Sequence, residues 1–134
     1  MPIEVIEHAG VRYAEVLRAS AQPQKSGFFS KESNSLQLGM LAYSAGQVIA
    51  PHTHEVRDRH IGDVQEFVFV KRGKLTIELF TEAGRKVADV TLAAGDSILL
   101  ISGAHSIRAH EDTQCIAVKQ GPFYGDDKIA VKTS

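Results

Sequence analysis

Short runs of alternating apolar and polar residues dominate the chain and predict β-strands. In Lys74–Phe80, leucine and isoleucine alternate with polar residues, which is the pattern of a strand buried on one face. Residues 66–70 are rich in valine and phenylalanine, as strands commonly are. The intervening Lys71-Arg72-Gly73 predicts a tight turn, so these two runs are expected to form a hairpin.

The same pattern continues on both sides of this hairpin. Turn residues such as Ala45-Gly46 and Ala94-Gly95-Asp96 separate the runs. No strong helical stretch lies between them, and seven or more short strands predict an all-β antiparallel sandwich or barrel. Further strands are predicted at residues 36–44, 47–54, 87–92, 97–101, 106–110 and 114–120.

The two ends of the chain are less regular. Residues 11–19 fit either an edge strand or one to two turns of amphipathic helix, and the periodicity does not decide between them. Residues 21–34 contain proline, glycine and several serines, which predicts a loop with Phe28 and Phe29 packed against the body. Residues 121–134 predict a turn followed by a short terminal strand.

Composition narrows the class of protein. The 134 residues fit a single domain, and 43% hydrophobic with 23% charged residues is ordinary for a globular chain. A formal net charge of −1 supplies no field to attract nucleic acid or an anionic membrane. We therefore expect neither partner.

The N-terminus lacks the pattern of a signal peptide, which predicts a cytoplasmic protein. The lone Cys115 lies in an apolar run, which predicts a buried, inert thiol.

Candidate chemistry begins with the sequence Pro51-His52-Thr53-His54. On a strand, alternate side chains point to the same face, with Cα atoms roughly 7 Å apart. His52 and His54 can then converge on one metal ion. By itself the signal is weak, because a surface His-x-His arises by chance in a chain with six histidines.

Two further residues strengthen the metal hypothesis. Glu66 begins an otherwise apolar strand, where a buried carboxylate needs a positive partner such as a metal ion. Without the histidines, a solvent-exposed strand end would be the better explanation. His105 follows a buried run and the turn at Ser102-Gly103, where another strand can bring it beside the other three.

These residues resemble the motifs of the cupin superfamily. Gly46, His52, His54, Glu66 and Gly73 are similar to the first cupin motif, and the run from Gly95 through Ile101 and Gly103 to His105 is similar to the second. The resemblance covers roughly residues 36–120, preceded by an N-terminal extension, residues 1–35. It implies a small antiparallel cupin-like barrel (a jelly roll, or double-stranded β-helix) that binds one metal through His52, His54, Glu66 and His105.

The eleven residues 55–65 between the histidine pair and Glu66 are the main departure from the family, whose gap is much shorter. This insertion offers Asp58 and His60 as substitute ligands. Three imidazoles and one carboxylate suit Fe, Mn, Ni, Zn or Co as the divalent ion, and the donor set does not choose among them.

Five residues are candidates for contacting a small ligand. Arg57 and Arg59 of the insertion can bind a carboxylate or phosphate, although a solvated loop with internal ion pairs is an equal explanation. Tyr43, Gln65 and Arg108 are assigned to the pocket from strand parity.

The predicted function is that of a metal-dependent cupin enzyme acting on a small polar substrate, similar to a sugar or keto acid, as an isomerase or dioxygenase. The alternative is a non-catalytic cupin module that binds a small ligand or metal, since fold does not determine function. A metal-free barrel is a weaker third hypothesis. We expect a homodimer, because a closed two-fold dimer is the commonest oligomer.

Overall fold

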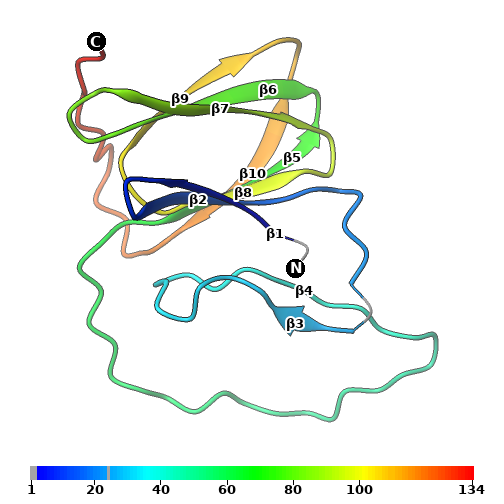
Figure 1. The fold of residues 1–134 in the computed structure, drawn as a ribbon. Helices are drawn as coiled ribbons and strands as arrows, with labels where there is room; N and C mark the ends of the chain where they lie inside the picture. The colour runs from blue at the N-terminus through cyan, green and yellow to red at the C-terminus, as the bar shows by residue number, and fades with distance from the viewer. Residues whose placement is uncertain (1–2, 24) are drawn as a thin grey trace.

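The computed structural model describes residues 3–23 and 25–134, in which every regular element is a β-strand (Figure 1). The all-β antiparallel prediction is confirmed. Within these residues no helix is long and apolar enough to cross a membrane. The strands are β1 (Ile3–His8), β2 (Val11–Leu17), β3 (Gly27–Phe28), β4 (Gly39–Met40), β5 (Glu66–Arg72), β6 (Lys74–Phe80), β7 (Lys86–Ala93), β8 (Ser97–Leu100), β9 (Ala104–Ala109) and β10 (Gln114–Lys119).

Two antiparallel sheets face one another around the main core. The larger has the order β1-β2-β8-β5-β10, and the smaller has the order β7-β6-β9. The predicted hairpin is wrong: β5 pairs with β8 and β10 in the larger sheet, whereas β6 pairs with β7 and β9 in the smaller one. The chain crosses from one sheet to the other at Gly73, which has φ +96°, because the two strands bury their apolar faces in the same core from opposite sides. A side chain at Gly73 would be strained at this φ and would collide with Asp112 and Thr113.

Strand alternation explains how the core forms. The inner residues of β6 are buried and pair with inner residues of β7, for example Ile77 with Val90. On the larger sheet Val68 and Ile98 are paired neighbours and face the same core. Ala14 and Val16 also belong to this core, so residues 11–17 form a strand rather than a helix. This strand lies between β1 and β8, not at the sheet edge.

A second apolar cluster covers the outer face of the larger sheet. Phe67 points away from Val68 and packs near Leu99 and Leu38 in this cluster, as the parity of β5 predicts. The small β3–β4 sheet and its flanking residues cover this face (Figure 1). Phe29 packs against the cluster as expected, whereas Phe28 is largely exposed.

The strands predicted at residues 36–44 and 47–54 are corrected by the structure. Only Gly39–Met40 of the first forms a strand, and the second forms none. The turn at Ala45-Gly46 is present, with Gly46 at φ +81°, but all residues from 41 to 64 are exposed. β-propensity depends on a neighbouring strand, and Pro51 removes one backbone donor, so this segment has no local basis for strand structure.

A closed barrel is not observed in the residues that the structure describes. β1 and β10 end the larger sheet, while β7 and β9 end the smaller one. Residues 41–64, named the excursion below, leave the body after β4 and return at β5 as a long loop (Figure 1). Residues 121–134 also contain no strand, contrary to the predicted terminal strand.

Candidate functional site

Two of the four predicted ligands meet between the sheets. Glu66 begins β5 on the face that Val68 shares, which points toward the main core. His105 lies on β9 opposite Leu79, whose side chain is buried in the same core. His105 Nε2 is 3.8 Å from Glu66 Oε1, so the carboxylate and the imidazole face each other from opposite sheets.

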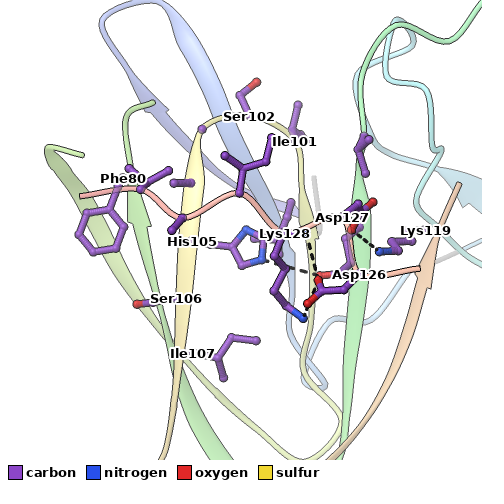
Figure 2. Close-up of a pocket in the computed structure, with 18 of the residues that line it drawn as sticks. Phe80, Ile101, Ser102, His105, Ser106, Ile107, Lys119, Asp126, Asp127 and Lys128 are labelled. Atoms are coloured by element: carbon purple, nitrogen blue, oxygen red, sulfur yellow. Dashed lines mark hydrogen bonds and ion pairs between the residues drawn. The ribbon is translucent and has the colours of Figure 1, made fainter. Parts of the chain in front are cut away.

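This pair lines a cavity of about 1160 Å³ at the open end of the two sheets. Figure 2 shows His105 among the lining side chains, with residues 126–128 of the C-terminal segment passing close by. Apolar side chains such as Phe80, Leu100 and Ile107 form much of the wall. A cavity of this size accommodates a small molecule, and its few polar groups can orient it.

The other two predicted ligands form a pair of their own in the excursion. The rings of His52 and His54 lie 5.2 Å apart between centroids, at an interplanar angle of 71°. His52 Nδ1 is 2.9 Å from the carbonyl oxygen of Ala50. If Nδ1 donates this hydrogen bond, Nε2 is left as the ligand atom, which is the usual arrangement of a metal-binding histidine.

The four predicted ligands do not form one cluster. Over residues 3–23 and 25–134, no group of three or more His, Cys, Asp or Glu side chains lies close enough to hold a metal ion. Each of the two pairs supplies two donors of the types that divalent ions bind, but the pairs are separate from one another in this structure.

The remaining candidates of the excursion are all solvent-exposed. Arg57 forms an ion pair of 2.8 Å with Glu55, and both side chains are mostly exposed. Residues 55–57 therefore belong to a solvated loop with an internal ion pair, which is the other explanation given above for the arginines of the insertion. The structure brings none of the other candidates to the cavity wall: Tyr43, Asp58, Arg59 and His60.

Two residues assigned to the pocket from strand parity do not line this cavity. Arg108 lies on the outer face of β9, where its guanidinium is 3.8 Å from Glu78. It is three positions from His105, and an odd separation on a strand puts two side chains on opposite faces. Gln65 is buried, but its side chain accepts from the Leu36 backbone N–H and donates to Asp63, and does not line the cavity.

Cys115 also differs from its prediction. It lies on β10, an edge strand, and is exposed rather than buried. Although the residue is exposed, partial desolvation of the thiol by neighbouring atoms raises its pKa, which disfavours the reactive thiolate.

Sequence reasoning missed Lys119 and the C-terminal segment. Lys119 is paired with Glu66 in the β10–β5 register and lines the cavity. Its Nζ is 3.1 Å from Oδ1 of Asp127, and this hydrogen bond lowers the pKa of the Asp127 carboxyl. The register of β10 against β5 would have revealed Lys119, but a single sequence does not specify that register.

No protein-family model, curated protein or solved structure matches this chain. Function is therefore argued from the site itself.

Proposed function

We propose that this chain binds one divalent metal ion through His52, His54, Glu66 and His105 and acts on a small polar molecule in the adjoining cavity. The observation that carries the proposal is the Glu66–His105 pair, which faces across a cavity large enough for such a molecule. The activity we propose is that of a cupin-type isomerase or dioxygenase on a sugar-like or keto-acid-like substrate.

The excursion supplies a physical route for joining the two halves of the site. β9 has β6 as its sheet neighbour on one side, and its other edge is unpaired within the described sheets. Residues 47–54 carry the apolar Val48 and Ile49, which are exposed in the excursion. Pairing these residues with β9 would cover apolar surface and carry His52 and His54 toward His105. The chain between His54 and Glu66 can span about 40 Å when extended, which is ample for this movement.

Each residue of the site would contribute in its own way. The Glu66 carboxylate would offset the positive charge of the ion, and the imidazoles would complete a set of four donors. When bound, the metal would supply Lewis-acid polarisation and a template for the substrate. The apolar wall formed by Phe80, Leu100 and Ile107 would limit access of water to the bound molecule.

We also propose that the chain is a homodimer. Ile116 and Val118 lie on β10 opposite Phe69 and Phe67, on the outer face of the larger sheet. Each is about half exposed, at 52% for Ile116 and 51% for Val118. An edge strand with exposed apolar side chains is a surface that a second copy can cover.

Metal content tests the site. Protein dialysed against a mixture of divalent ions is expected to retain about one ion per chain, falling below about 0.2 in His52→Ala and in His105→Ala, because each variant removes a donor. Elemental analysis by mass spectrometry measures this ratio. His8→Ala is the matched control, since His8 is an exposed histidine at the end of β1.

Two results would contradict the metal site. One is wild-type protein with less than about 0.2 ion per chain, and the other is full metal content in both ligand variants. His60→Ala separates the substitute ligand from the proposed set, since it should leave the metal content unchanged. Circular dichroism checks that each variant keeps its β structure.

Turnover separates an enzyme from a non-catalytic binding module. Metal-loaded protein is expected to consume O₂ or to isomerise at least one member of a panel of sugars and keto acids. An oxygen electrode and NMR of the substrates provide the two readouts. Saturable ligand binding without turnover across the panel would favour the non-catalytic module.

A further inference from the structure

The C-terminal segment covers the side of the cavity that holds Glu66 and His105. Residues 121–134, named the strap below, contain no helix or strand, and many of them line the cavity. In Figure 2 the strap crosses the view from Asp127 and Lys128, passes close to His105 and continues toward Phe80. The chain therefore places a segment of its own along the cavity, close to His105.

Lys119 is the cation that the strap engages in this cavity. It ends β10 directly opposite Glu66 in the register. Ala117, two positions earlier and so on the same face of the strand, pairs with the core residue Val68. Lys119 therefore belongs to the inner face of the larger sheet. Its ammonium is 3.1 Å from a carboxylate oxygen of Asp127, and Figure 2 shows this contact.

We propose that Lys119 is the anion-binding residue of the cavity, that its ligand is a carboxylate on a small molecule, and that Asp127 of the strap occupies this position until such a molecule displaces it. This inference rests on the proposed function, because it names the class of molecule that the cavity accepts. An ammonium group binds a carboxylate through charge-assisted hydrogen bonds, and the strap presents the same chemical group to it.

The strap is held weakly enough to be displaced. The side chains of Lys119 and Asp127 are 38% and 51% exposed. An ion pair this accessible to water changes an equilibrium by only about two- to fivefold. At the far end, the Ser134 N–H donates to the Gly84 carbonyl oxygen over 3.1 Å. Phe123 and Ile129 of the strap are 85% and 88% exposed, so they contribute little packing.

The position of Lys119 suits a molecule that carries a carboxylate next to other oxygen atoms. Its β-bridge partner is Glu66, which in turn faces His105 at 3.8 Å. A carboxylate bound to the ammonium would direct the remainder of a small molecule toward that pair. This arrangement would select an acid over its neutral amide, because only the acid offsets the charge of Lys119.

Titration of the full chain with malonate, in metal-free buffer at constant ionic strength, tests this inference. The ¹H–¹⁵N signals of β5, β9 and β10 report binding. Asp127→Asn removes the competing carboxylate and is expected to lower the Kd for malonate about two- to fivefold relative to the wild type. Lys119→Met is expected to abolish the shifts, and Lys119→Arg to retain them. Malonamide, the neutral analogue, is expected to produce none.

The neighbouring acid provides a matched control. Asp126 lies 3.7 Å from Lys128, and both side chains are mostly exposed. Asp126→Asn removes the same charge from the adjacent position, and its effect on the Kd should be less than about twofold because it leaves the pair with Lys119 intact. A parallel titration with inorganic phosphate distinguishes the two kinds of anion, and tighter binding of phosphate than of malonate would overturn the carboxylate assignment.

Equal Kd values for the wild type and Asp127→Asn would overturn the role of the strap. Unchanged binding in Lys119→Met would overturn the role of the lysine. Because the titration contains no metal, these failures are distinct from failure of the metal site, which the metal content of the histidine variants tests separately.

Discussion

Replacing Ile77 with alanine is expected to lower the free energy of unfolding by about 2–5 kcal/mol. Ile77 is fully buried on β6, the central strand of the smaller sheet, where Val90 flanks it on one side and Ile107 on the other. Alanine would remove three carbon atoms from a packed core. The cavity left behind would persist, because β6 is held in place by β7 on one side and by β9 on the other. Urea denaturation followed by circular dichroism measures the difference.

Ile107 supplies a matched control for this experiment. It is the same residue type, is paired directly with Ile77 and lies on the same face, but is 52% exposed. Ile107→Ala is therefore expected to cost only about 1 kcal/mol, since about half of the side chain already contacts water. Equal losses from the two substitutions would contradict the placement of the core between the two sheets.

Replacing Glu15 with alanine is expected to cost about 2–4 kcal/mol. Glu15 is fully buried on the outer face of β2, and its Oε2 accepts hydrogen bonds from Arg12, from the backbone N–H of Lys31 and from Asn34. Its removal would leave these donors without their acceptor and release the loop at residues 31–34. Thermal and urea unfolding measure the loss.

Glu7 is the control for Glu15, because it forms an ion pair with the same Arg12 at 3.2 Å but its side chain is 53% exposed. Glu7→Ala is expected to change the free energy of unfolding by at most about 0.5 kcal/mol. A loss at Glu7 as large as that at Glu15 would show that the charge on Arg12, and not the buried carboxylate, stabilises this region.

Local pattern was sufficient wherever a strand alternates cleanly. The bounds of Lys74–Phe80 are predicted without error, and Glu66–Arg72, Lys86–Ala93 and Ser97–Leu100 lie close to the expected ranges. Lys74–Phe80 shows the period of two that reveals a buried apolar face directly, whereas Ser97–Leu100 is a continuous, mostly apolar run that is buried on both faces. Ile3–His8 was not predicted, because its side chains are mostly exposed and its alternation carries little signal.

The pattern of apolar and polar residues gave a wrong prediction where strand formation depends on a neighbouring strand. Residues 47–54 contain β-branched residues and a His-x-His spacing, but in the structure they pair with no strand. Arg108 is three positions from His105 on the same strand, so its side chain lies on the opposite face, beside Glu78.

The sequence by itself determined the all-β class, the bend at Gly73 and the chemical types of the candidate ligands, because these depend on residue identity and local spacing. It did not determine that the strands on the two sides of this bend lie in different sheets. Only the tertiary structure decided that Glu66 and His105 meet across the two sheets, that His52 and His54 form a separate pair, and that Lys119 and Asp127 join them at the cavity. The contacts of Glu66 with His105 and of Lys119 with Asp127 depend on how elements far apart in the chain pack together, whereas His52 and His54 form a separate pair because residues 47–54 join no sheet. Where no short turn joins two strands, as with β5 and β10, their register follows from which faces are buried together, and the local pattern of one strand does not specify its partner.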